Sequence, residues 1–229
     1  MDTGNDPRFS VLDRALLDVK RIFEMGRVKK AIDKHKAVTT CEHGHRLLMT
    51  LRYCYGEPGQ MRAMGEFREL MGVADDVEAL LGGPAFPEQI KEQPIAVAQV
   101  AWTLATLRSL GPRLDLPGSQ AETAIDVAAG RVVSAHPHPE ADNLLVTRLG
   151  AGRPLVVVTN DATVKAEDRV GVAILPPIDL RGVVSQGMFL GAGHGILKTV
   201  QAGPGGRPDV PDNAYGETRS MVKQYLEHK

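Results

Sequence analysis

The sequence has 229 residues, of which 43% are apolar and 24% are charged. This length gives room for one large domain or two small ones, and the apolar content supports a packed core. Because 27 Lys and Arg residues stand against 28 Asp and Glu residues, the net charge is −1. The composition therefore excludes attraction of a polyanion by overall charge, and a nucleic-acid partner requires a local basic patch.

The cysteines are Cys41 and Cys54, too few for a disulfide framework, so we expect a reduced, cytoplasmic setting. Charged residues such as Asp6, Arg8 and Asp13 near the start exclude the apolar core of a signal peptide. No apolar run is long enough to cross a bilayer, so no membrane association is predicted.

Residues 1–110 predict an all-α helical domain. Asp6 is suited to cap a helix that has Pro7 at its first position. Apolar side chains then recur at three- and four-residue spacing, the pattern of one buried helix face: Phe9, Leu12, Leu16, Val19 and Phe23. Lys29 to Lys36 predicts a short polar helix, and Thr39 with Glu42 predicts a capping box at the start of the next helix. Residues 95–110 are apolar on nearly every face and predict a buried helix.

Residues 111–121 contain two glycines and two prolines and predict a linker. After this linker the periodicity changes to short β-prone runs separated by Gly, Pro and Asp, at 127–133, 144–149, 155–158 and 170–175. Closely spaced strands of this kind are typical of a small barrel or sandwich. Residues 193–229 then form a C-terminal extension, in which 217–227 predict a short helix.

Several motifs follow one another in this second half. Gly130-Arg131-Val132-Val133 comes first, and His136-Pro137-His138-Pro139-Glu140-Ala141-Asp142-Asn143-Leu144-Leu145 follows it. Val156-Val157-Val158-Thr159-Asn160 comes next, and the last is Leu180-Arg181-Gly182-Val183-Val184-Ser185-Gln186-Gly187-Met188-Phe189-Leu190. In this order and spacing, the segments resemble the tRNA-binding domain family over about residues 124–192. That family includes appendage domains of methionyl- and tyrosyl-tRNA synthetases, free-standing tRNA-binding proteins and a secretion chaperone.

The resemblance implies a five-stranded OB-fold β-barrel over residues 122–192. The expected fold class is therefore α+β multidomain, with an all-α domain at 1–110, a linker at 111–121, the barrel, and the extension at 193–229. The resemblance also implies a non-catalytic protein that binds structured tRNA and assists an aminoacyl-tRNA synthetase. Family members often carry a segment beyond the barrel that forms, or imitates, a dimer interface, so we expect a homodimer.

The resemblance places Arg181, Ser185, Gln186 and Met188 in the loop and strand that contact RNA. Such residues suit the task, because arginine grips phosphate with paired hydrogen bonds and a hydroxyl bonds phosphate or ribose. A methionine adds an adaptable apolar contact. Further basic residues are candidates for the rest of the patch: Arg131, Arg148, Arg153, Lys165 and Arg169.

Phe189 is the single aromatic residue of the predicted barrel, whereas general single-strand binders stack bases on several aromatics. This favours recognition of the shape and backbone of a folded RNA. Asn143 stands where the family commonly has lysine, which removes one positive charge from the expected RNA face. The alternative function is a polypeptide-binding chaperone or a protein-docking scaffold, because the same family contains a secretion chaperone and the fold alone does not decide between RNA and polypeptide as the partner.

Two groups of metal-type residues are interpreted as structural. His136 and His138 are each followed by proline, which indicates a stiff turn into the second strand. Cys41, His43 and His45, with Cys54, lack the spacing of zinc fingers. We therefore expect no metal, no cofactor and no catalytic residue.

A basic cluster lies within residues 20–36, where Glu24 and Asp33 are the only acids: Lys20, Arg21, Arg27, Lys29, Lys30, Lys34 and Lys36. Two interpretations remain open for this cluster. It extends the RNA footprint, or it is the solvated face of a helix.

Overall fold

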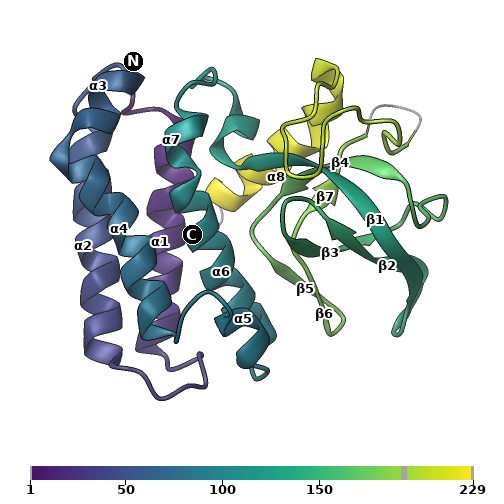
Figure 1. Cartoon of the computed structure of the whole chain (residues 1–229), viewed down its shortest axis with the longest axis horizontal. Coiled ribbons are helices and arrows are strands. Elements are labelled where there is room, and N and C mark those ends of the chain that lie inside the picture. Colours follow the sequence, from purple (N-terminus) through teal and green to yellow (C-terminus); the bar gives the residue numbers. More distant parts are fainter. Residues whose placement is uncertain (1, 192–194, 228–229) are drawn as a thin grey trace. The chain divides into compact units, whose positions relative to one another are not determined.

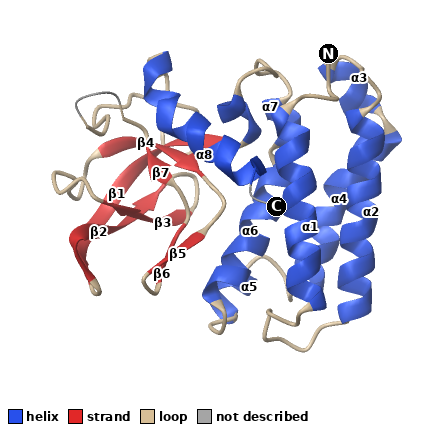
Figure 2. Cartoon of the chain, turned by 180° about the vertical axis from the view of Figure 1, so that it is seen from behind, coloured by secondary structure: helices blue, strands red, loops and turns tan. Residues whose placement is uncertain are grey.

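The computed structural model describes residues 2–191 and 195–227, and the chain divides into two compact units (Figure 1). The first unit ends at Ala124 and is helical, and the second begins at Ile125 and is built on an antiparallel sheet. Figure 2 shows the same division by secondary structure. The predicted order, a helical region followed by a sheet domain, is confirmed. None of the helices in the described ranges has the length and apolar character needed to span a membrane.

Four long helices form the helical unit: α1 (Pro7–Glu24), α2 (Lys34–Arg52), α4 (Gly65–Leu80) and α6 (Pro94–Arg108). Helices α1 and α4 each pack against both α2 and α6, so the four share one core. The short helix α3 (Pro58–Ala63) lies between α2 and α4, and α5 (Phe86–Gln89) lies between α4 and α6. Two more short helices follow α6: α7 (Leu110–Arg113) and the 3-10 helix η1 (Ala121–Ala124). The stripe predicted from Phe9 to Phe23 lies in this core.

The helix starts show one success and one correction. The side chain of Asp6 accepts a hydrogen bond from the backbone N–H of Arg8, so the predicted cap of α1 is confirmed. The helix start predicted at Thr39 by the capping box with Glu42 is wrong, because α2 already begins at Lys34. Its cap is Asp33, which accepts from the N–H of Lys36 at 2.9 Å. The Thr39 hydroxyl donates instead to the carbonyl of His35, a bond that a helix-interior threonine can make.

The sheet unit contains an antiparallel sheet in the order β3-β2-β1-β4-β7. Its five strands are β1 (Asp126–His138), β2 (Ala141–Gly150), β3 (Pro154–Thr159), β4 (Arg169–Ile174) and β7 (Met188–Phe189). A separate hairpin consists of β5 (Ile178–Leu180) and β6 (Val183–Ser185). Buried side chains line the core face of the sheet, including Val132, Leu149, Leu155, Val157, Val170 and Val172.

The two edges of this sheet are connected by the segment between β6 and β7. The N–H of Gln186 donates to the carbonyl of Val156 at 2.8 Å, and the N–H of Val156 donates to the Gln186 side-chain oxygen at 2.9 Å. The N–H of Val158 donates to the Ser185 hydroxyl at 3.1 Å. Edge strand β3 is therefore bonded to the residues that lead into the other edge strand, β7.

The C-terminal extension contributes to the sheet unit. Gly205 donates to the carbonyl of Ala129 at 2.8 Å, and Ala129 donates to the carbonyl of Gly206 at 2.7 Å. The predicted terminal helix is confirmed as α8 (Gly216–Glu227), which follows the 3-10 helix η2 (Asp212–Tyr215). The extension thus supplies a strand-like segment beside β1 and a helix. Its predicted part in a dimer interface stays a prediction.

The segment expected to be a linker, 111–121, lies within the helical unit. Buried Arg113 holds it there by donating to the carbonyls of Thr106 at 2.5 Å, Thr123 at 3.2 Å and Ala124. Buried Arg8 pairs with Asp6 and donates to the carbonyls of Leu116, at 2.9 Å, and Arg113. Glycine and proline content predicted a linker, and in the fold these two guanidinium groups bind carbonyls in and just after it.

Candidate nucleic-acid interface

The β1–β2 turn is fastened to the tip of the β5–β6 hairpin. His138 is buried; its Nδ1 accepts from the N–H of Glu140 at 3.0 Å, and its Nε2 bonds the carbonyl of Leu180 at 2.9 Å. Because Nδ1 accepts from Glu140, Nε2 is assigned as the donor to the carbonyl of Leu180. The expected structural role of this motif is confirmed, and it fixes the position of the hairpin tip.

Arg181 occupies that tip. Arg181 and Gly182 form a two-residue turn with φ of 51° and 86°, the left-handed pair that hairpin turns favour. Asp179 accepts from the N–H of Gly182 at 2.7 Å, and the exposed Arg181 side chain donates to the carbonyl of Glu140 at 2.9 Å. The guanidinium is thus pre-positioned by one bond while its remaining donors face solvent, as a phosphate contact requires.

Ser185 and Gln186 have bonds inside the protein. The Ser185 hydroxyl is buried, donates to the carbonyl of Gly187 at 3.2 Å and accepts from Val158. The Gln186 side chain accepts from Val156. RNA contact by these two residues stays a prediction, and the geometry gives them a further role in holding β3 to the β6–β7 segment.

Met188 is half-buried on β7 and lies between two hollows. One, of about 570 Å³, is lined by polar side chains that include Asn143, Thr159 and Asn160. The other, of about 310 Å³, is apolar, and its lining includes Ile178, Leu180, Met221 and Tyr225. A flexible thioether at this point can contact a ligand in either hollow.

Arg131, Arg148 and Arg169 share the face of the sheet that is opposite its core. Arg131 is the direct partner of Arg169 on β4 and of Gly150 on β2, and Arg148 lies two residues before Gly150. Cross-strand partners, and residues two apart on one strand, point to the same side. All three arginines are exposed. The register therefore brings together two of the predicted RNA contacts with the further candidate Arg169.

Arg153 and Lys165 lie at two connections of the sheet. Arg153 is half-buried between β2 and β3, where burial lowers the pKa of its guanidinium and nearby Asp126 partly offsets this effect. Lys165 is exposed in the connection before β4. The eight predicted contacts therefore fall on the hairpin region, the outer sheet face and two connections, instead of forming one cluster.

The basic cluster of residues 20–36 is largely used by the helical unit. Lys30 donates to the carbonyl of Leu81 at 2.6 Å, and Lys34 donates to the carbonyl of Glu24 at 2.5 Å; these carbonyls end α4 and α1. Lys20 forms ion pairs with Glu42 at 2.8 Å and Glu24 at 3.5 Å.

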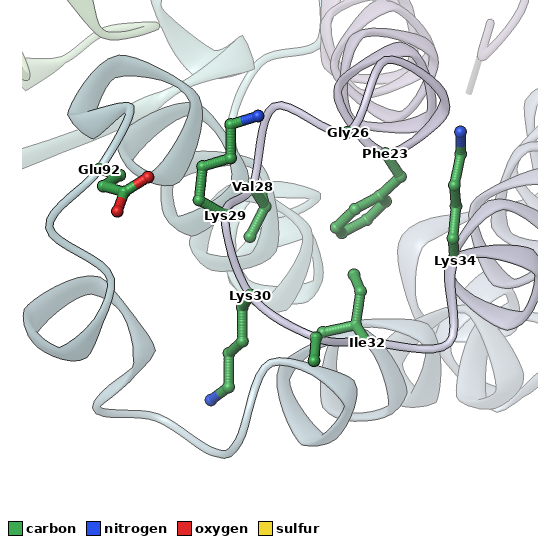
Figure 3. A pocket seen from close by; sticks show the side chains of 9 residues that line it. Phe23, Gly26, Val28, Lys29, Lys30, Ile32, Lys34 and Glu92 are labelled. Atoms are coloured by element: carbon green, nitrogen blue, oxygen red, sulfur yellow. The ribbon is translucent and has the colours of Figure 1, made fainter.

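A hollow of about 450 Å³ lies beside Lys29, Lys30 and Lys34. Figure 3 shows Phe23, Val28 and Ile32 pointing toward its middle, while Lys29 and Lys34 extend toward the top of the view, well apart, and Lys30 extends toward the bottom. Their ammonium groups do not converge on one point, as an anion site would require. The geometry does not favour an anion site here. The short helix predicted for Lys29 to Lys36 is wrong, because residues 29–33 belong to the α1–α2 connection and α2 begins at Lys34.

The candidate metal residues are spread apart. Cys41 is buried in the helical core, which raises the pKa of its thiol to about 12. His45 lies 2.7 Å from Asp13, and His43 lies 3.7 Å from Glu69. Among residues 2–191 and 195–227, no group of three or more His, Cys, Asp or Glu side chains is placed to hold a metal ion.

Comparison with known families agrees with this architecture. Residues 127–206 match the family model described as a putative tRNA binding domain, and residues 1–117 match the one described as an alpha helical domain. The sheet unit is thus a member of the tRNA-binding domain family, as the motifs predicted. The chain as a whole belongs to the family defined by the alpha helical domain, which covers just over half of its length, and joins that domain to a tRNA-binding domain.

Several curated tRNA ligases are similar to part of this chain. The phenylalanine–tRNA ligase beta subunit of Clostridium acetobutylicum is 33% identical over 101 residues, which cover 36% of this chain and 13% of that subunit. The methionine–tRNA ligase of Protochlamydia amoebophila is 37% identical over 84 residues, 33% of this chain and 12% of the ligase. The cytoplasmic tyrosine–tRNA ligase of Gallus gallus is 33% identical over 88 residues, 35% of this chain and 17% of the ligase. The chain therefore spans less than a fifth of the length of these relatives.

Glu167 lies beside the candidate contact Arg131, and the sequence motifs did not indicate it. It lies in the connection before β4, has a φ of 77° and forms an ion pair with Arg131. A glutamate carries no signal for a left-handed backbone, which Gly, Asn and Asp favour. Only the folded chain brings its carboxylate to an arginine 36 residues away in sequence.

Proposed function

We propose that this protein is a non-catalytic tRNA-binding protein whose sheet unit holds structured tRNA. The observation that carries the proposal is the match of residues 127–206 to the tRNA-binding domain family. Similarity to segments of three different tRNA ligases supports it, because what these segments share is tRNA as the partner of the whole enzyme. A role in assisting an aminoacyl-tRNA synthetase, a cytoplasmic location and a homodimer belong to the same proposal.

The proposed architecture of the binding unit is an OB-fold barrel. The bonds that Ser185 and Gln186 make to β3 support it, because they connect the two edges of the five-stranded sheet. In such a barrel the turn between the first two strands and the long connection after the fourth flank the binding face. Here the Glu140 turn and the Arg181 hairpin are those two segments, and they are bonded to each other.

The proposed contacts are made to phosphate and ribose. Arg181 grips phosphate at the hairpin tip, and Met188 with the amides of Asn143 and Asn160 contacts the sugar edge. Arg131, Arg148, Arg153 and Lys165 extend the phosphate contacts over the sheet and its connections. Ser185 and Gln186 hold the hairpin segment in place for this contact. Phe189 is buried, so base stacking on it is not part of the proposal.

The test is a titration of the full chain with folded tRNA and with a single-stranded DNA of equal length. We expect tighter binding of tRNA, since shape and 2′-hydroxyl contacts favour it and exposed stacking aromatics are lacking along the strands. Arg181→Asn should weaken tRNA binding roughly tenfold through loss of a charge-assisted contact. Asparagine is the choice here because it tolerates the left-handed backbone of this turn. Equal affinity for the two nucleic acids, or an unchanged affinity in the variant, would contradict the proposal.

A second candidate function is supported by one feature, the apolar hollow between the β5–β6 hairpin and α8. Its lining by Ile178, Leu180, Met188, Met221 and Tyr225 suits an apolar segment of a polypeptide. The same titration, repeated with an unfolded polypeptide in place of nucleic acid, separates the two functions. Polypeptide binding that Met221→Lys abolishes, together with no affinity for tRNA, would favour the chaperone.

A further inference from the structure

Arg131 and Arg169 form a like-charged pair on neighbouring strands. They are direct partners in the β1–β4 register, so their side chains leave the sheet on the same side. Two positive charges in this position repel each other and destabilise a sheet unless an anion lies near them. The pair borders a hollow of about 400 Å³ whose lining also includes Glu167, Ala202 and Pro204.

Glu167 supplies that anion from within the chain. Its carboxylate pairs with the guanidinium of Arg131. Its backbone N–H donates to the carbonyl of Val132 at 2.8 Å, which holds the residue beside β1. The φ of 77° is a left-handed conformation that is strained for a residue other than glycine. The surrounding bonds thus keep a strained residue where its carboxylate meets the arginine.

The ion pair between Arg131 and Glu167 is nevertheless exposed, with 60% of the Arg131 side chain and 67% of the Glu167 side chain open to solvent. Exposed ion pairs contribute little to stability, because water screens the two charges. A phosphate group offers more than this carboxylate, because it can accept paired hydrogen bonds from both guanidinium groups. The Glu167 carboxylate is therefore a weaker ligand for these two arginines than a phosphate group would be.

We propose that Arg131 and Arg169 form a binding subsite for one backbone phosphate of RNA, and that Glu167 occupies this subsite in the free protein as a built-in competitor. Binding of RNA moves the carboxylate away from Arg131 and puts a phosphate in its place. This inference rests on the proposed tRNA-binding function and gives it a second anchoring point besides Arg181. It also assigns to Glu167 the role of limiting affinity at that point.

The test uses the full chain and the isosteric variant Glu167→Gln. We expect tRNA affinity to rise about three- to tenfold, because the competing charge is lost while the backbone is unchanged. The logarithmic salt dependence should steepen by up to about 0.9, the value for one more phosphate contact that is not already neutralised. Glu227→Gln is the matched control, since it removes the same charge from an exposed position at the end of α8.

Double variants locate the effect. In an Arg131→Gln or Arg169→Gln background, Glu167→Gln should bring less than half of its gain, and each arginine change alone should weaken tRNA binding. Three outcomes overturn the inference while tRNA binding itself stands. The affinity of Glu167→Gln does not rise, the control Glu227→Gln shows the same rise, or the rise persists in full in the Arg131→Gln and Arg169→Gln backgrounds. Absence of tRNA binding by the unaltered protein overturns both proposals. If inorganic phosphate binds saturably and tRNA does not compete with it, Arg131 and Arg169 bind a small anion, which would overturn the RNA subsite.

Discussion

At the residue scale, His136 and His138 show how two identical side chains in one motif have different roles. Each is followed by proline, and the spacing alone does not distinguish them. In the fold His136 is exposed, whereas His138 is buried and bonds two backbone groups at the turn and the hairpin. Within this motif, only His138 therefore fastens the β1–β2 turn to the β5–β6 hairpin, an arrangement that we call the His138 lock.

This difference gives a stability prediction. His138→Phe keeps the ring but removes both hydrogen bonds, and it leaves the Glu140 N–H and the Leu180 carbonyl without that partner. We expect the free energy of unfolding of the sheet unit to fall by about 2 kcal/mol. Urea unfolding followed by circular dichroism measures it. His136→Phe is the control and should change stability by less than about 0.5 kcal/mol; equal effects of the two changes would contradict the lock.

Sequence patterns predicted the kind of site better than its geometry. The ordered motifs identified the family, because they preserve residue types at fixed spacing. They did not show that Ser185 and Gln186 bond β3, since the direction of a loop depends on strand edges that meet only in the fold. Glu167 was missed for the same reason, as its pairing with Arg131 requires the β1–β4 register.

At the element scale, the helix ends explain part of the basic cluster. Helices α1 and α4 end in carbonyls that lack intrahelical partners, and a lysine from the α1–α2 connection donates to each of them: Lys34 to Glu24 and Lys30 to Leu81. Positive charge at a helix C-terminus also interacts favourably with the helix dipole. Apolar stripes predicted most of these helices, but such caps come from distant residues and have no local pattern.

A pair of variants tests this role. Lys30→Met should lower the free energy of unfolding of the helical unit by roughly 0.5–1 kcal/mol, because α4 loses a charged cap at its last carbonyl. Lys29→Met is the matched control, as this neighbouring side chain is exposed and makes no hydrogen bond or ion pair within the described residues. The fluorescence of Trp102, which lies in α6, follows unfolding of this unit. A loss of stability in Lys29→Met as large as in Lys30→Met would refute the capping role.

At the scale of the whole molecule, positive and negative charges balance, but basic side chains gather at particular places on each unit. The chain has a net charge of −1, yet the sheet unit presents arginines on one face and at a hairpin tip. The helical unit carries its own basic cluster, but several of those groups are bonded to helix ends or acids. Affinity for a polyanion should therefore come from the sheet unit.

Salt dependence measures this directly. Replacing Arg27, Lys29 and Lys36 together by glutamine removes the basic side chains of the cluster that are exposed and have no side-chain bond within the described ranges. We expect the logarithmic salt slope of tRNA binding to stay unchanged within error, while Arg181→Asn lowers it by roughly 0.7–0.9, the value for one phosphate contact. A drop of similar size in the triple variant would show that the helical unit adds to the RNA footprint.

The arginine-held segment before the sheet unit decides where the chain can be cut into separately folding fragments. A cut at the predicted boundary near residue 121 would remove the Thr123 and Ala124 carbonyls from Arg113 and leave a buried guanidinium short of acceptors. The helical fragment therefore has to extend through Ala124. The sheet fragment then starts at Ile125, one residue before β1. Because the units meet directly in the sequence and only the buried Ile125 separates η1 from β1, almost no free chain is left in which to place an insertion, a fusion tag or a protease site.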